Sequence, residues 1–144
     1  MPILAGHTSR WLMTVQILLA CHGTSTMPDG ASLPVEFSSS RIYSGSGSPT
    51  FEVQPRAIHV TGIVPVNTPC YDFSGSATLR GDTVDVVVLA TNQPRICQQV
   101  LSAYKFDAHI TRVPSGIHTV TLRYKYQGVL NYETLIATTD LAVP

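Results

Sequence analysis

Residues 73–90 read FSGSATLRGDTVDVVVLA, in which two alternating runs of apolar or small and polar side chains flank Gly81-Asp82. A two-residue loop with glycine first suits a type II′ turn, whose twist matches that of paired strands. A hairpin centred on this turn sets like against like: Leu79 opposite Val84, Ala77 opposite Val86, Phe73 opposite Ala90, and Thr78 opposite Asp85 on the other face. Because a slip of one residue would move every apolar side chain to the wrong face, the stretch predicts an antiparallel hairpin with this register.

The same register indicates how two of the three cysteines meet. Cys70 falls opposite Gln93, four residues short of Cys97, so a bridge across the open mouth of the hairpin requires only a short loop. Closing a loop of roughly 26 residues stabilises a fold by about 3 to 4 kcal/mol in the chain-entropy account. The alternative is a pair of free buried thiols. We expect a Cys70–Cys97 disulfide, conditional on export to an oxidising compartment.

A second hairpin is predicted from two alternating runs, Ala103–Arg112 and His118–Tyr126, joined through Pro114-Ser115-Gly116. A three-residue loop with glycine in the left-handed position is a common hairpin connection. This register forms one core face from four cross-strand pairs: Ile110 with Val120, Ala108 with Leu122, Phe106 with Tyr124, and Tyr104 with Tyr126. The opposite face is solvated and places Asp107 beside Arg123, His109 beside Thr121, and Lys105 beside Lys125.

Four further strands complete the prediction: Val35–Tyr43 as an edge strand, Thr50–Gln54, Ala57–Val64 and Glu133–Val143. Four apolar residues recur at period two in the last of them: Leu135, Ala137, Leu141 and Val143. Ten glycines and ten prolines are scattered between the runs, as is typical of folds with many short strands. The expected fold is all-β, a single antiparallel β-sandwich of about seven strands over residues 35–144.

The N-terminal segment has the pattern of an export signal. Residues 1–10 contain no acidic side chain and end in Arg10, and residues 11–20 form an uncharged, mostly apolar run of ten. That run is too short to span a bilayer, which needs about 20 apolar residues, so residues 1–20 are predicted to be a signal peptide. The run ends in Leu18-Leu19-Ala20-Cys21, which resembles the lipobox of bacterial lipoproteins. In a lipobox the cysteine becomes the first residue of the mature chain and carries acyl groups. A plain secretory signal and a buried apolar strand are the alternatives.

The cysteine count agrees with lipidation at Cys21, because removing that thiol leaves Cys70 and Cys97 as an even pair. Residues 21–34 are poor in large apolar groups and are expected to form a flexible tether. No aspartate directly follows Cys21, which favours the outer membrane over retention at the inner one. The expected location is the bacterial cell envelope, with the domain held on a membrane by its lipid anchor.

Four features lie along residues 57–144: Thr68-Pro69-Cys70, the Gly81-Asp82 turn, Cys97, and Pro114-Ser115-Gly116 in a closing hairpin. In these features the segment resembles small immunoglobulin-like domains of uncharacterised bacterial lipoproteins. The chain departs from antibody domains because its one tryptophan, Trp11, does not lie between the two cysteines. The resemblance implies an immunoglobulin-like sandwich and no particular activity.

Candidate sites are few. Arg80-Gly81-Asp82 spells a tripeptide read by some host integrins, and a hairpin tip exposes it, although the turn alone accounts for its glycine and aspartate. His59, His109 and His118 lack metal-ligand spacing and are expected to be surface imidazoles, so no metal or cofactor is predicted. No Gly-x-Ser-x-Gly or paired-carboxylate motif is present, which argues against an enzyme. Exposed tyrosines, Tyr43, Tyr71 and Tyr132, belong either to a binding face or to the rim of a small core.

The sequence favours a non-enzymatic binding or structural module tethered at the cell envelope, acting on an envelope protein or glycan. Nine basic and nine acidic residues balance, and charged residues make up only 12% of the chain, so no strong field attracts nucleic acid. One alternative is a secreted adhesion or inhibitor domain that uses Arg80-Gly81-Asp82 or the sandwich loops. The other is a hydrolase, which would require a histidine gathered with a carboxylate and a serine.

Overall fold

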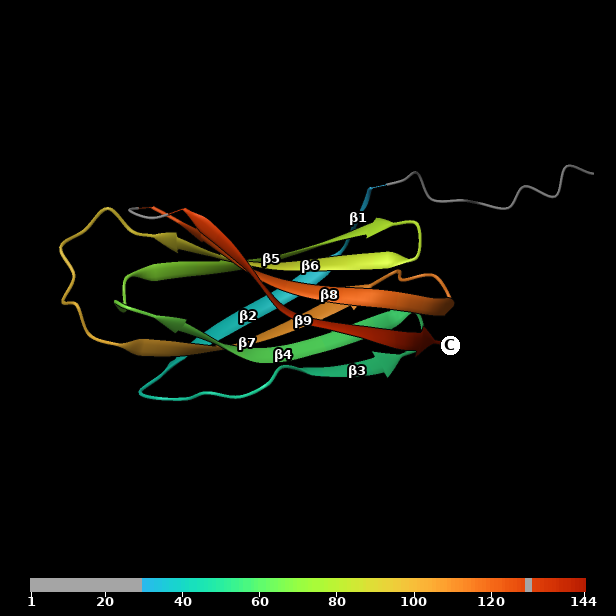
Figure 1. Cartoon of the computed structure of the whole chain (residues 1–144), viewed down its shortest axis with the longest axis horizontal. Coiled ribbons are helices and arrows are strands. Elements are labelled where there is room, and N and C mark those ends of the chain that lie inside the picture. Colours follow the sequence, from blue (N-terminus) through green and yellow to red (C-terminus); the bar gives the residue numbers. More distant parts are fainter. Residues whose placement is uncertain (1–29, 129–130) are drawn as a thin grey trace, which may run out of the picture.

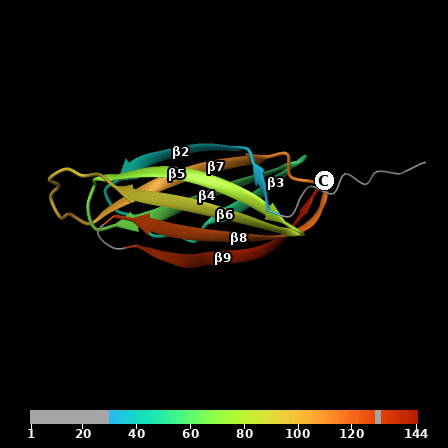
Figure 2. The same cartoon turned by 90° about the horizontal axis from the view of Figure 1, so that it is seen from above.

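Two β-sheets lie face to face in the computed structural model, which describes residues 30–128 and 131–144 (Figure 1). The five-stranded sheet has the order β1 (Ala31–Leu33), β5 (Tyr71–Arg80), β6 (Thr83–Asn92), β8 (Gly116–Gln127), β9 (Tyr132–Val143). The four-stranded sheet has the order β2 (Val35–Ile42), β7 (Ser102–Thr111), β4 (Ala57–Val66), β3 (Thr50–Gln54). The strands of both sheets run along the long axis of the molecule (Figure 2). This arrangement confirms the all-β sandwich, with nine strands in the described residues in place of about seven.

The hairpin of β5 and β6 has the predicted register. Leu79 lies opposite Val84, Ala77 opposite Val86, and Phe73 opposite Ala90. Gly81 has a φ of 55°, as a type II′ turn requires of its first central residue. At the open end of the hairpin the Gln93 amide donates a hydrogen bond to the Cys70 carbonyl at 2.9 Å, so the pairing continues one step beyond the two strands.

The predicted pairing of residues 103–112 with residues 118–126 is wrong. β7 pairs with β2 and β4, whereas β8 pairs with β6 and β9 in the other sheet. Residues 112–115 cross between the sheets, with Arg112 at a φ of 62° and Val113 fully buried. Phe106 and Tyr124, expected to be neighbours on one sheet, meet instead across the interior with ring centroids 6.0 Å apart. An alternating sequence shows which face of a strand is buried, and two inward faces can meet either side by side or across a sandwich.

The crossing of β7 to the opposite sheet also makes β6 and β8 parallel neighbours, a departure from the expected antiparallel sandwich. Parallel neighbours need a crossover connection, and here β7 supplies it. The pairing of Asp107 with Arg123 is wrong for the same reason. Asp107 bonds His59, and Arg123 lies near Asp85 and Glu133.

The sandwich begins earlier than predicted. Residues 31–33, assigned to the tether, form β1, which pairs with β5 while Leu33 is buried in the core. The chain then crosses sheets at Pro34, whose carbonyl accepts a hydrogen bond from Thr111. A strand of three residues is too short for its alternation to be recognised in the sequence. The predicted signal peptide and Cys21 lie outside the described residues, and no helix among the described residues is long and apolar enough to cross a membrane.

One of the last strand's apolar residues faces solvent. The β8–β9 register shifts between Leu122 and Arg123, so that Ile136 is an extra residue between Leu135 and Ala137. A bulge of this kind reverses the alternation on one side of it. Leu135 is therefore 58% exposed, whereas Ile136 packs against the core.

Candidate functional site

The two ends of the sandwich are formed by different loops and chain ends (Figure 1). Gly30, the Gly81-Asp82 turn and Pro144 lie at the right-hand end of the view, where the Gly30 amide donates to the Leu79 carbonyl. The left-hand end carries the loop of residues 93–101 and the open mouth of the β5–β6 hairpin. We call the two ends the Gly30 end and the Tyr71 end.

A cleft of about 460 Å³ opens at the Tyr71 end. Its lining comes from five strands and two loops: Pro65, Val66, Asn67, Thr68, Tyr71, Asn92, Gln99, Leu101, Tyr126 and Tyr132. The volume falls within the range of about 300 to 1,000 Å³ that is common for small-molecule sites.

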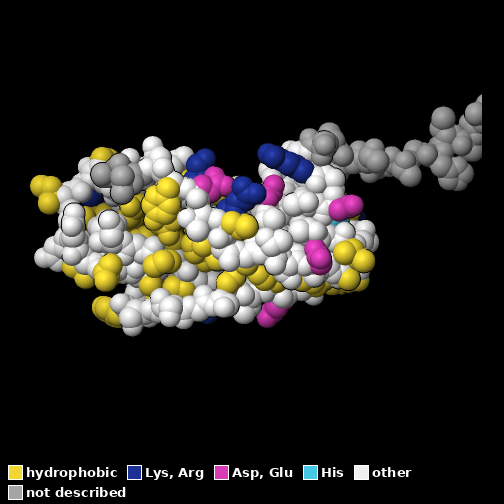
Figure 3. Space-filling model, viewed as in Figure 1, with side chains coloured by type: hydrophobic (Ala, Val, Ile, Leu, Met, Phe, Trp, Pro, Cys, Tyr) yellow, Lys and Arg dark blue, Asp and Glu magenta, His cyan; other side chains and the backbone are white. Residues whose placement is uncertain are grey.

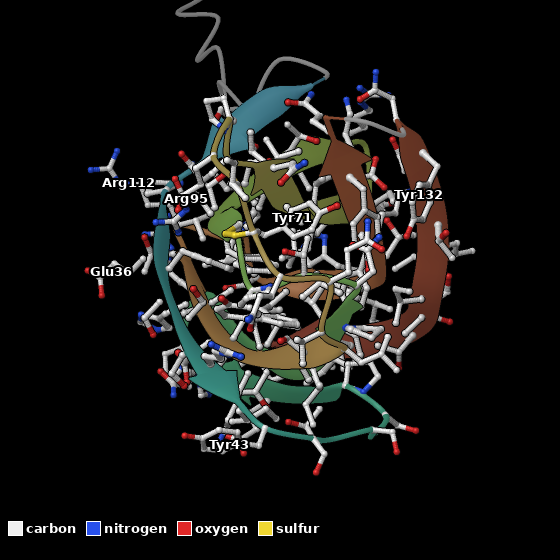
Figure 4. The ribbon with its side chains drawn as sticks, turned by 90° about the vertical axis from the view of Figure 1, so that its left-hand side faces the viewer. Glu36, Tyr43, Tyr71, Arg95, Arg112 and Tyr132 are labelled. Atoms are coloured by element: carbon white, nitrogen blue, oxygen red, sulfur yellow. A yellow bond between two sulfur atoms is a disulfide. The ribbon has the colours of Figure 1, made fainter. Side chains whose placement is uncertain are left out.

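Aromatic rings form the floor and one wall of this cleft. Tyr132 stacks on Tyr126, with ring centroids 4.3 Å apart and planes 17° from parallel. Tyr71 meets Tyr126 edge to face at 6.3 Å. Viewed toward the Tyr71 end, Tyr71 lies in the middle between the sheets and Tyr132 lies at the side over β9, whereas Tyr43 is far from both (Figure 4). The structure thus brings together two of the three tyrosines singled out from the sequence, through a third that the sequence assigned to the core.

Tyrosine hydroxyls hold the floor in place at an open strand edge. β3 pairs with β4 only as far as Thr61, so within residues 30–128 and 131–144 no strand pairs with this edge of β4 beyond Thr61. The hydroxyl of Tyr124 donates to the Ile63 carbonyl and that of Tyr126 to the Pro65 carbonyl, both at 3.0 Å. Proline is accommodated at this edge because its position needs no backbone N–H donor there. Tyrosine side chains of the five-stranded sheet therefore supply hydrogen-bond donors to backbone carbonyls of the four-stranded sheet.

Burial raises the pKa of the Tyr124 hydroxyl to about 12 and that of Tyr126 further, the latter with added contributions from Tyr132 and its other tyrosine neighbours. Both groups consequently remain neutral hydrogen-bond donors at any physiological pH.

The second wall of the cleft is the loop that carries Cys97. Cys70 and Cys97 lie at disulfide distance, with Cα atoms 6.2 Å apart, which confirms the predicted pair. Gln99 and Leu101 follow Cys97 by two and four residues and face the cleft. Because the bond ties this loop to the start of β5, the disulfide fixes a wall of the site as well as the fold.

The cleft is uncharged. None of its ten lining residues is acidic or basic, and besides the tyrosine hydroxyls the polar side-chain groups are the amides of Asn67, Asn92 and Gln99 and the hydroxyl of Thr68. In the space-filling view, most charged side chains lie over the middle and right-hand part, and the left-hand end shows hydrophobic and uncharged side chains with few charges (Figure 3). Such a lining favours a neutral ligand, because a charge moved into it would lose hydration without gaining a partner.

The Arg80-Gly81-Asp82 tripeptide is exposed, as predicted, but lies at the opposite end. It sits beside Gly30, where the chain joins the sandwich. The structure does not bring it near the tyrosines of the cleft.

A separate row of titratable groups crosses the outer face of the four-stranded sheet. Glu36, His109, His59 and Glu52 lie opposite one another on β2, β7, β4 and β3. His59 Nε2 is 2.9 Å from an Asp107 carboxylate oxygen, and its Nδ1 is 3.5 Å from Glu52. The hydrogen bond to Asp107 raises the pKa of His59 above its ordinary value of 6.5, and the charges of Asp107 and Glu52 add to it against the opposing effect of burial.

We expect an NMR titration to place the midpoint of His59 above 6.5, and Asp107→Asn to lower it. Because the folded-state pKa is raised, the stabilisation is fully present below the unfolded pKa and is lost as the pH rises through the folded pKa. The difference in the free energy of unfolding between the parent and Asp107→Asn should therefore be larger at pH 5.5 than at pH 8.5. These two pH values lie about one to two units on either side of the ordinary pKa of histidine. Glu36→Gln, which removes only the partner of His109 at 4.0 Å, is the matched control. A His59 midpoint unmoved by Asp107→Asn would contradict the assignment.

The third histidine was predicted to be a surface imidazole, and this is wrong. His118 is only 4% exposed, and its Nε2 hydrogen bonds to the Pro114 carbonyl at 2.8 Å. It lies on the inward face of β8 beneath residues 112–115. Its burial depends on the crossing of these residues between the sheets, which the sequence did not predict. His118 lies in the five-stranded sheet, whereas His59 and His109 lie in the four-stranded sheet. Among the described residues no group of three or more His, Cys, Asp or Glu side chains is arranged to hold a metal ion.

The fold and the cleft define the protein as a β-sandwich with an aromatic, uncharged cleft at one end. Comparison with known proteins gives no match: no family model, no curated protein and no solved structure is significantly similar to this chain. What the chain does must therefore be argued from the cleft, the disulfide and the N-terminal sequence.

Proposed function

We propose that this protein is an exported, lipid-anchored, non-enzymatic binding module of the bacterial cell envelope, which binds its partner through the cleft at the Tyr71 end. One observation carries the proposal: the chain joins the sandwich at Gly30, and the uncharged cleft lies at the other end. A tether running from Cys21 to Gly30 would hold the domain with its cleft turned away from the membrane.

In the part of the chain that the structure describes, no catalytic group is assembled, which agrees with a binding role. His59 and Asp107 are hydrogen bonded, but they lie on the outer face of a sheet, away from the cleft. Among the described residues no hydrogen bond joins His59 or His109 to a serine or cysteine, as nucleophilic catalysis would require. The cleft itself contains no titratable carboxylate or imidazole.

Adhesion through Arg80-Gly81-Asp82 is the competing function, and the geometry counts against it. That turn lies beside Gly30, so a tether from Cys21 would place it on the membrane side of the domain. The substitution Asp82→Glu distinguishes the two functions. It should abolish adhesion through the tripeptide and leave binding at the cleft unchanged.

Metabolic labelling with a fatty-acid analogue tests the anchor. We expect label on the parent chain and none on Cys21→Ser, because acylation requires that thiol. Ser25→Ala, a change of similar size four residues further on, should keep the label. Equal absence of label from parent and Cys21→Ser would contradict the lipid anchor and leave a freely secreted domain.

A further inference from the structure

We propose that the cleft is a carbohydrate site that takes a neutral oligosaccharide, with a pyranose ring stacked on Tyr132; this inference rests on the proposed binding role of the cleft. A pyranose has C–H groups on its faces and hydroxyls around its edge. A site for it needs an accessible aromatic face beside uncharged hydrogen-bonding groups, and the cleft offers both.

Tyr132 provides the aromatic face. Its side chain is half exposed, yet the ring is not free to collapse, because the nearly parallel ring of Tyr126 covers one side. Tyr126 is in turn fixed by its hydrogen bond to Pro65 and its contact with Tyr71. A ring held from behind loses little conformational freedom when a ligand covers its open face.

The amides provide the hydrogen bonds. Asn67, Asn92 and Gln99 line the cleft from a loop after β4, the end of β6 and the disulfide-tied loop, so donors and acceptors approach from three sides. Each amide has two N–H donors and an acceptor oxygen, which match hydroxyls that both donate and accept. A purely aliphatic ligand would cover these groups and leave them unpaired, at a cost in binding.

A peptide strand does not fit the open edge beside the cleft. Strand addition needs free backbone groups along an edge, and the carbonyls of Ile63 and Pro65 already accept from Tyr124 and Tyr126. Pro65 also lacks the N–H that an added strand would pair with. The chemistry of the cleft therefore favours a sugar over an extended peptide.

Calorimetric titration of the full chain with two neutral trisaccharides, cellotriose and triacetylchitotriose, tests the inference, with a glucuronic acid oligomer as the charged comparison. We expect at least one neutral sugar to bind and the charged one to bind less. Tyr132→Ala should weaken binding by about tenfold, which corresponds to about 1.4 kcal/mol, whereas Tyr132→Phe should stay close to the parent because the ring face makes the contact. Tyr43→Ala is the matched control, since Tyr43 is an exposed tyrosine outside the cleft, and it should bind as the parent does.

The carbohydrate inference would be overturned if the parent binds neither of the two neutral sugars, or if Tyr132→Ala binds a sugar as tightly as the parent does. A pull-down from envelope fractions separates that failure from failure of the binding role. If Tyr132→Ala loses a component that the parent and Tyr43→Ala retain, the cleft binds something other than these sugars and only the carbohydrate inference falls. If all three chains retain the same components, the binding role of the cleft falls with it.

Discussion

Phe106→Ala should lower the free energy of unfolding by about 3 to 5 kcal/mol, the usual cost of removing a buried phenylalanine ring. Phe106 is 1% exposed and lies between the two sheets. Its ring stacks on Phe37 at 6.1 Å and meets Tyr124 edge to face at 6.0 Å. Since domains of this size are stable by only about 5 to 15 kcal/mol, the loss would be a large share of the total. Urea unfolding followed by circular dichroism measures it.

Gly62 gives a control with a defined geometry. A Cβ added at Gly62 would lie 2.7 Å from the Phe106 ring, so Gly62→Ala should cost about 1 to 3 kcal/mol through overpacking. In a Phe106→Leu background the ring is gone, and the same change should cost clearly less. Additive effects of Gly62→Ala and Phe106→Leu would show that the ring does not occupy the space assigned to it.

Replacing the cysteine pair, as Cys70→Ala with Cys97→Ser, should lower the free energy of unfolding by about 3 to 4 kcal/mol, because the unfolded chain gains the freedom of a loop of about 26 residues. Alanine suits position 70, which is buried, and serine suits the partly exposed position 97. The rate of amide hydrogen exchange should rise most in residues 98–101, because this wall of the cleft is no longer linked to β5 by the disulfide.

A reductant provides the control for the disulfide prediction. It should destabilise the parent by a similar amount and leave the double variant unchanged. A double variant as stable as the parent, or one still sensitive to the reductant, would contradict a structural role for the Cys70–Cys97 bond.

Local features of the fold were predictable because they depend on residues close together in sequence. The Gly81-Asp82 turn fixes the β5–β6 register by itself, and that register also aligned Cys70 with the loop that carries Cys97. The inward faces of β7 and β8 were predicted for the same reason, from alternation alone.

Features that depend on distant partners were not predictable. The burial of Phe106 and Tyr124 is the same whether their strands are neighbours or face each other, so the sequence could not place residues 112–115 as a crossing between sheets. The parallel β6–β8 pair and the burial of His118 both follow from that crossing.

The cleft was predictable only in part. Tyr71 and Tyr132 were expected to be exposed tyrosines of a binding face or a core rim. Tyr126 continued the core pattern of β8 and gave no sign that it also supports a surface ring. Asn67, Asn92 and Gln99 lie in loops or at a strand end, where no periodicity marks them. They lie close together because the end of β4, the end of β6 and the loop that carries Cys97 all lie at the Tyr71 end, and this arrangement is set by the topology of the fold.

The tyrosine hydroxyls on the carbonyls of Ile63 and Pro65 bear on how closely copies of the domain can be crowded. An uncovered strand edge is a template on which a second molecule can add its own strand and start aggregation. Along this half of β4 the acceptors are already used by side chains from within the same molecule. Many copies packed side by side would therefore find the carbonyl acceptors of Ile63 and Pro65 already occupied, which hinders the addition of a strand from a neighbouring copy at that edge.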